Sequence, residues 1–277
     1  MDDSNDNNDE RLPTGGTPFE KLVNLMAQLR DPENGCPWDI EQTFSSVAPY
    51  TIEEAYEVLD AIEAGNMESL QEELGDLLLQ VVFHSQIASE ANLFNQNDVV
   101  EGIVNKMIRR HPHVFGTAQN RTAEAQQSAW EAQKAIERSA KSNSDSAIDG
   151  VALALPALLR AAKIQKRAAR TGFDWTNPED IFSKIEEETA EVRDAMAERN
   201  QNNITEEIGD LLFVIANLAR RLEVDPEDAL RRANTKFERR FKTMETLAKK
   251  QSRSFADLSL QEQETLWKTV KALEVKD

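Results

Sequence analysis

The chain has 277 residues, and its 50 acidic against 32 basic residues give a net charge of −18 at pH 7. This balance argues against a nucleic-acid backbone or an anionic membrane as the main partner, because both are themselves negatively charged. One cysteine rules out a disulfide within the chain, and the lack of a run of about 18 apolar residues predicts no transmembrane helix, so we expect a cytoplasmic protein.

Residues 1–14 are acidic and polar, which predicts a disordered tail rather than a signal peptide. Apolar residues at helical spacing then predict a first helix that ends near 32–35, followed by a turn at 36–39. A second helix is expected from about 52 to Gly65, with Thr51 as its N-cap and Glu54 completing a capping box.

Three more helices are expected in the first half, over 67–91, 98–110 and 123–138. His111 and His113 flank a proline, so they do not share one helix face, and we interpret this segment as a loop rather than a metal site. Residues 139–149 are rich in serine and polar side chains, which predicts a linker.

The second half predicts helices over 153–170, 179–199, 203–222, 226–250 and 260–274. Asn177-Pro178 and Asp225-Pro226 mark two of the starts, because proline is favoured in the first turn of a helix. No segment alternates with the period of a strand. We therefore predict an all-α fold with domains over 15–138 and 151–277, joined by a flexible linker over 139–150.

The two halves repeat one another. Trp38 and Trp130 are 92 residues apart, and so are Trp175 and Trp267. The pattern Glu-Glu-x-x-Glu at 53–57 returns at 187–191, an offset of 134 residues. Such matched spacing indicates a duplication rather than chance.

Each half carries two acidic helices. Residues three apart lie on one face of a helix, so every helix presents a pair of carboxylates. If the two faces meet, four like charges converge, which is costly without a cation. The pairs are Glu54 with Glu57, Glu73 with Asp76, Glu188 with Glu191, and Glu207 with Asp210.

The alternative reading is a set of solvated acidic faces, but the repetition favours a divalent metal site present twice. Carboxylate ligands select a hard ion such as Mg²⁺, with Mn²⁺ as a substitute. A di-iron site would need Glu-x-x-His motifs, which neither half has.

Basic residues recur beside these helices. Lys106, Arg109 and Arg110 in the first half, and Lys236, Arg239 and Arg240 in the second, suit a polyphosphate, although pairing with acidic neighbours would explain them too. The tryptophans fit either core packing or stacking on a base, and we favour stacking for Trp130 and Trp267.

The chain resembles the MazG family of two-domain nucleoside triphosphate pyrophosphohydrolases over about residues 18–275. The resemblance rests on segments in both halves, namely Leu29–Asp39, Glu53–Glu57, Glu72–Asp76, Arg109–Phe115, Gly172–Trp175 and Glu206–Phe213. It implies tandem MazG-type helical bundles, usually assembled as a homodimer, that hydrolyse nucleoside triphosphates such as ATP to the monophosphate and pyrophosphate with Mg²⁺. In such proteins the second half is usually the active one, and the first set of carboxylates is then silent.

The resemblance also implies roles for residues of the second half. Glu188, Glu191, Glu207 and Asp210 would hold metal, with Glu187 and Glu206 beside them. Our own mechanistic hypothesis is that Glu187 or Glu188 positions the attacking water as a base. The candidate nucleotide-binding residues are Lys184, Glu206, Lys236, Arg239, Arg240 and Trp267. The sequence leaves open the base that is preferred and a non-catalytic alternative, a helical regulator that binds a nucleotide or a protein. Cleavage of a different pyrophosphate, such as a phosphoribosyl-nucleotide or an alarmone, is a further enzymatic alternative.

Overall fold

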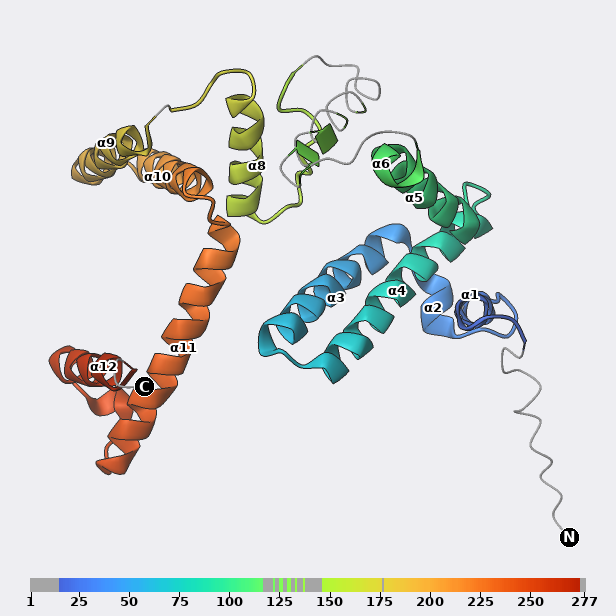
Figure 1. Cartoon of the computed structure of the whole chain (residues 1–277). Helices are drawn as coiled ribbons and strands as arrows, with labels where there is room; N and C mark the ends of the chain where they lie inside the picture. The colour runs from blue at the N-terminus through green and yellow to red at the C-terminus, as the bar shows by residue number, and fades with distance from the viewer. Residues whose placement is uncertain are drawn as a thin grey trace, which may run out of the picture. The chain divides into compact units, whose positions relative to one another are not determined.

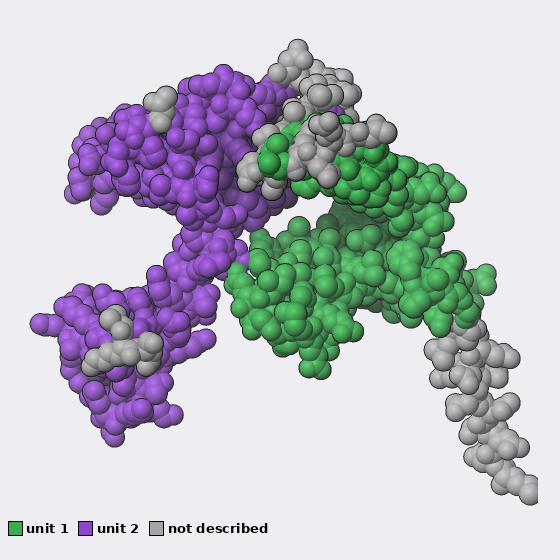
Figure 2. Space-filling view, viewed as in Figure 1, with its two compact units in different colours: residues 1–133 green, residues 134–277 purple. Residues whose placement is uncertain are grey.

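The computed structural model describes residues 15–116, 146–175 and 177–274, together with 122, 125–126, 129–130, 133 and 137. The chain divides into two compact units, residues 1–133 and 134–277, which are green and purple in Figure 2. Every regular element among the described residues is a helix, which confirms the predicted all-α fold (Figure 1). No helix in this part of the chain is long and apolar enough to cross a membrane.

Some predicted features cannot be compared with the structure. The predicted tail, most of the helix expected over 123–138 and most of the linker lie outside the described residues. Those boundaries stay predictions.

The first unit is organised around a helical hairpin of α3 and α4 (Figure 1). Gly65 ends α3 with a left-handed φ of 66°, and the Asn66 side chain then caps α4 by accepting two backbone N–H groups. α1 packs on α4, and the buried core between these helices consists of Met26, Val47, Val82, Phe83 and Ile87. The helices of this unit are α1 (Pro18–Leu29), α2 (Pro37–Glu41), α3 (Phe44–Ala64), α4 (Met67–Glu90), α5 (Gln96–Arg110) and α6 (Pro112–Phe115).

Arg30, directly after α1, fixes this helix to its neighbours. Its side chain is buried and donates to both carboxylate oxygens of Glu90 at the end of α4, at 2.9 and 2.7 Å. It also donates to the backbone carbonyls of Asp39 and Gln42. The guanidinium, which follows α1, therefore satisfies acceptors on α4 and at the end of α2 at once, which a smaller cation could not do.

The start of α3 differs from the prediction. Thr43 accepts from the N–H of Ser46, whose hydroxyl accepts from the N–H of Thr43, so the capping box lies before Phe44 and not at Thr51. Thr51 is instead an interior residue of α3, and its hydroxyl oxygen lies 3.0 Å from Nε2 of His84. Pro49 is tolerated within the helix, although proline normally disfavours a helix interior.

Two segments expected to be irregular are short helices. The predicted turn at 36–39 is part of α2, which has Pro37 in its first turn. The predicted loop at His111–His113 includes the start of α6, with Pro112 again in the first turn. In both cases proline provides the φ angle that starts a helix, so the prediction of irregular structure is wrong at these two segments.

The second unit repeats the hairpin with α9 and α10, and α8 packs on α10 (Figure 1). The predicted helix starts at Pro178 and Pro226 are confirmed, with Asn177 and Asp225 as side-chain caps. A second buried cluster, formed by Met244, Ala248, Leu258, Leu266 and Val270, joins α11 to α12. The helices are α8 (Ala157–Ala169), α9 (Pro178–Glu198), α10 (Gln201–Arg221), α11 (Pro226–Lys250) and α12 (Leu260–Glu274), with a 3₁₀ turn at Phe255–Asp257.

Candidate functional site

In the second unit, the hairpin of α9 and α10 brings carboxylates from both helices together. Glu188 comes from α9, and Glu207 and Asp210 lie three residues apart on α10. Each offers an oxygen within 4.8 Å of the oxygens offered by the other two. Glu191, the fourth predicted ligand, lies outside this group of three but close enough to be affected by its charges.

Glu188 is the buried member of the cluster. Only 4% of the residue is exposed, although a charged side chain is costly to bury without partners. Its Oε1 forms an ion pair with Lys184 Nζ at 2.8 Å, whereas its buried Oε2 has no hydrogen-bond partner. A cation bound between the carboxylates would satisfy this oxygen.

The electrostatics of the cluster are those of crowded like charges. Desolvation, and then the charges of Asp210 and Glu188, raise the pKa of Glu207. Desolvation, followed by the charges of Glu188 and Glu207, likewise raises the pKa of Glu191. Hydrogen bonds to Glu188 and then to Glu187 raise the pKa of Lys184, so this lysine stays charged. The site therefore favours binding of positive charge.

The chemistry of these donors fits a divalent cation. All ligands in the group are carboxylate oxygens, with no histidine or cysteine among them. Hard ions such as Mg²⁺ and Mn²⁺ prefer this kind of ligand, and Mg²⁺ completes its shell with water and substrate phosphates. Glu188, Glu207 and Asp210 would hold the ion, with Glu191 beside them.

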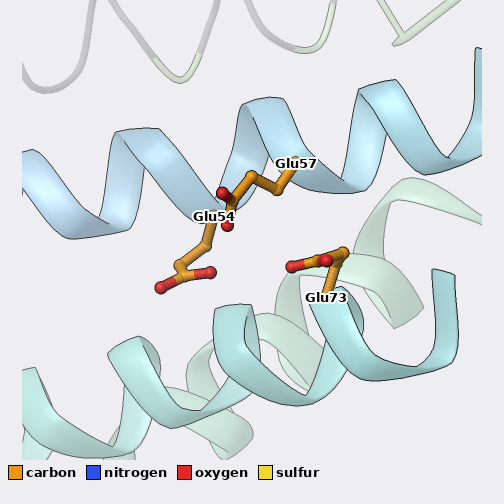
Figure 3. Close-up of side chains that lie close together, drawn as sticks. All are labelled: Glu54, Glu57 and Glu73. Carbon is orange, nitrogen blue, oxygen red and sulfur yellow. The ribbon is translucent and has the colours of Figure 1, made fainter. Parts of the chain in front are cut away.

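The first unit has a related cluster with a different membership. Glu54 and Glu57 of α3 and Glu73 of α4 point toward one another (Figure 3), with oxygens within 4.8 Å of each other. Here Asp76 is the predicted ligand outside the group. Desolvation, and then the charges of Asp76 and Glu57, raise the pKa of Glu54, and desolvation and the charge of Glu57 raise that of Glu73. The two repeats thus each gather three of the four predicted carboxylates, but not the equivalent three.

The predicted nucleotide-binding residues of α11 and α12 form a group of their own. The guanidinium of Arg240 lies 5.3 Å from the centre of the Trp267 ring, and both of its donors reach Oε2 of Glu274, at 2.9 and 2.7 Å. Arg239 binds the other carboxylate oxygen of Glu274. These pairs hold the pKa of Glu274 at about 2.

Other predicted residues are placed as follows. Lys236, Glu187 and Glu206 are exposed, and Glu187 accepts from Lys184 at 2.9 Å. Trp267 is half-buried and also contacts Phe237, with ring centres 5.6 Å apart, so it both packs and keeps part of its surface exposed. Trp130 donates its ring N–H to the carbonyl of Arg110 and lies edge-on to His111, an arrangement that is typical of packing.

Sequence reasoning missed Glu274 as the partner of both arginines. No short-range pattern connects it to Arg240, which lies 34 residues earlier in the chain. The contact between Lys184 and Glu188 could have been found, because a spacing of four residues places two side chains on one helix face.

Comparison with known proteins gives a consistent result. The family model described as the MazG nucleotide pyrophosphohydrolase domain matches residues 42–115 and again residues 176–244. Each match includes one helical hairpin and its carboxylate cluster.

Relatives to which the chain is similar over more than nine-tenths of its length include the following three. It is 46% identical over 261 residues to a nucleoside triphosphate pyrophosphohydrolase of Escherichia coli (strain K12), which covers 93% of this chain and 98% of the relative. It is 45% identical over 260 residues to the nucleoside triphosphate pyrophosphohydrolase/pyrophosphatase MazG of Thermotoga maritima, covering 94% and 98% of the two chains. It is 42% identical over 257 residues to the uncharacterised protein YabN of Bacillus subtilis, covering 92% of this chain and 52% of that one.

Proposed function

The chain belongs to the MazG family of nucleotide pyrophosphohydrolases, and we propose that its second repeat cleaves nucleoside triphosphates with the help of Mg²⁺. As a member of this family it is a nucleoside triphosphate pyrophosphohydrolase, a hydrolase that releases pyrophosphate. The dependence on Mg²⁺, a broad tolerance for the base and a role in nucleotide housecleaning or stress-response nucleotide control are our proposals.

The observation that carries the metal proposal is the buried, unpartnered Oε2 of Glu188 within a cluster of three carboxylates. A structural role alone gives no reason to bury an unsatisfied charged oxygen beside two further negative charges. A divalent ion with substrate phosphates would provide the missing positive charge.

The residues of the second repeat have separate roles in the proposed reaction. Glu188, Glu207 and Asp210 would hold a metal ion, with Glu191 beside them. When bound, the ion would supply positive charge for the triphosphate oxygens and would acidify a water. Glu187 or Glu188 orients the water and accepts its proton as attack occurs at the α-phosphorus. Pyrophosphate then leaves with charge that Lys184, Lys236 or Arg240 stabilises.

The nucleotide is bound by residues of α11 and α12 in this proposal. Arg240 lies against the Trp267 ring, and a planar guanidinium fixed in this way can bind a phosphate through two hydrogen bonds. The partly exposed face of Trp267 offers a surface on which any base can stack, which supports broad base tolerance.

We also propose that the protein is a cytoplasmic homodimer. α10 leaves Ile208, Leu212 and Ile215, which share one face of the helix, exposed in the single chain, although a helix of a monomer normally covers such side chains. A second copy packed on this face would bury them, as in the homodimers expected from the family resemblance.

Product analysis tests the proposed function. The full-length protein is incubated with each nucleoside triphosphate and Mg²⁺, and the products are separated by anion-exchange chromatography. We expect monophosphate and pyrophosphate, which Asp210→Asn abolishes and the matched first-repeat change Asp76→Asn leaves largely intact. Diphosphate and phosphate would instead exclude attack at the α-phosphorus. Nucleotide and metal binding without any turnover would favour a non-catalytic regulator.

A further inference from the structure

Lys184 forms ion pairs with two residues of the proposed site. Its Nζ lies 2.9 Å from Oε1 of Glu187 and 2.8 Å from Oε1 of Glu188. The lysine side chain is 32% exposed, whereas that of Glu188 is only 5% exposed. The partly exposed lysine side chain thus places its ammonium group against the buried carboxylate of Glu188.

The first repeat has no lysine at the equivalent position. At the repeat offset of 134 residues, Tyr50 occupies the position of Lys184, and its ring lies edge-on to Trp38 at 6.1 Å. Among the described residues, no lysine or arginine forms an ion pair with Glu54, Glu57 or Glu73. The Lys184 contact is therefore not required to build the hairpin, because the first repeat forms the same hairpin without it.

The position of Lys184 conflicts with a metal ion on the same carboxylate. A divalent ion held by Glu188, Glu207 and Asp210 would lie close to an ammonium group that already occupies Glu188 Oε1. Two positive centres at such a distance repel each other strongly in a partly buried site. The ion therefore binds weakly unless the lysine side chain leaves Glu188. A bound triphosphate is an anion that offers the lysine a new partner.

We propose that Lys184 is an internal counter-cation that competes with the divalent metal ion for Glu188 and passes to the triphosphate when metal and nucleotide bind together. The inference rests on the proposed function, since it concerns the same site. It implies that free metal binds weakly and that nucleotide strengthens metal binding. By linkage, the metal strengthens nucleotide binding by the same factor.

Calorimetric titration with Mn²⁺ in the absence of nucleotide tests this competition. The full-length chain carries Glu54→Gln, Glu57→Gln and Glu73→Gln, so that only the second cluster titrates. Lys184→Gln removes the charge but keeps a hydrogen-bond donor for Glu188, and we expect it to tighten Mn²⁺ binding by about tenfold or more. Lys184→Arg keeps the charge and should retain weak binding.

A second change controls for the overall charge of the protein. Lys250→Gln, at the end of α11, alters the net charge by the same amount as Lys184→Gln without touching the cluster. It should leave the Mn²⁺ affinity unchanged. Equal tightening by both variants would show a general charge effect and overturn the inference.

A non-hydrolysable triphosphate analogue tests the transfer of Lys184 to the nucleotide. In the chain that retains Lys184, a saturating analogue should tighten Mn²⁺ binding markedly, and in Lys184→Gln most of that gain should disappear. If Lys184 only contacts phosphate, its loss would weaken analogue binding but leave the affinity for free Mn²⁺ unchanged, which would overturn the competition.

The stability of the variant gives an independent readout. Removal of the lysine charge leaves Glu188 buried without a counter-charge, so Lys184→Gln should melt at a lower temperature in chelator and gain more from Mn²⁺ than the parent does. An equal increase in melting temperature with Mn²⁺ in variant and parent would contradict the inference. The proposed function would still stand if the unmodified protein hydrolyses nucleotides. If no variant binds Mn²⁺ and the unmodified protein has no activity, the proposed function itself fails.

Discussion

Arg240 lies between the ring of Trp267 and the carboxylate of Glu274, so one side chain links the middle of α11 to two positions on α12. Arg239 binds the same carboxylate from the adjacent position. Glu274 therefore neutralises two arginines that are also candidate phosphate ligands. This dual role gives two predictions, one about stability and one about substrate binding.

Glu274→Gln should remove an acid-sensitive part of the stability. The pKa of Glu274 is about 2 in the folded chain, below its ordinary value of 4.5, because of the hydrogen bonds from Arg240 and Arg239. A depressed pKa contributes stability that is present above about pH 4.5 and is lost as the pH falls toward 2. The urea midpoint of the parent should exceed that of the variant at pH 7, and the two should converge near pH 2. A gap that does not change with pH would contradict the assigned ion pair.

Arg240→Gln should weaken nucleotide binding. It removes a guanidinium that can bind phosphate through two hydrogen bonds, so we expect KM for a nucleoside triphosphate to rise about tenfold, or about 1.4 kcal/mol. Arg253→Gln is the matched control, because Arg253 pairs with Glu262 and has no proposed role in binding. Steady-state kinetics check both variants. An unchanged KM in Arg240→Gln would remove α11 from the nucleotide site.

The carboxylates could be found from the sequence because their spacing is local. Glu207 and Asp210 lie three residues apart on one helix, and the duplication repeats the pattern in the other half. The identity of the three that converge could not be predicted, since it depends on how the two helices of each hairpin are aligned. That alignment groups Glu57 with its neighbours in one repeat and leaves the equivalent Glu191 outside in the other.

Helix boundaries were less predictable where tertiary contacts decide them. Thr51 has a good capping sequence, but the N-cap of α3 lies eight residues earlier, at Thr43, and the helix begins at Phe44. Phe44 there lies parallel to the ring of His84 on α4, with ring centres 6.0 Å apart. This contact and the capping box at Thr43 stabilise the first turn of α3. Local propensity alone does not favour a helix there, because Pro49 follows within the same helix.

Glu207→Gln should separate activity from stability. Loss of one proposed metal ligand is expected to lower kcat on the order of 10²- to 10³-fold, the usual cost of removing one preorganised charge-stabilising group. The same change relieves repulsion with Asp210 and Glu188, so the melting temperature at pH 7.5 in chelator should rise. Thermal unfolding with and without Mg²⁺ checks this, and Mg²⁺ should stabilise the parent more than the variant. A lower melting temperature in chelator would show that the cluster is not repulsive.

Gly35 and Gly172 occupy equivalent positions in the two repeats, but the structure requires glycine for different reasons. A Cβ on Gly35 would lie 2.4 Å from the carbonyl oxygen of Leu29 and 2.6 Å from that of Asp31. Gly172 has open space around it, but its φ of 91° lies in the left-handed region that L-residues avoid. The same residue type thus relieves a steric clash in one repeat and backbone strain in the other.

Gly35→Ala should therefore loosen the connection between α1 and α2. The added methyl group meets backbone atoms that cannot rotate away, so we expect a cost of about 1–3 kcal/mol, as for overpacking. Gly172→Ala should cost about 1–2 kcal/mol through its φ angle alone. Gly102→Ala is the control, because Gly102 lies within α5 in open space and alanine there should stabilise the helix by about 0.5–1 kcal/mol. Hydrogen exchange measured by mass spectrometry should show faster exchange over residues 26–42 in Gly35→Ala only, and unchanged exchange there would show that the backbone yields without loss of structure.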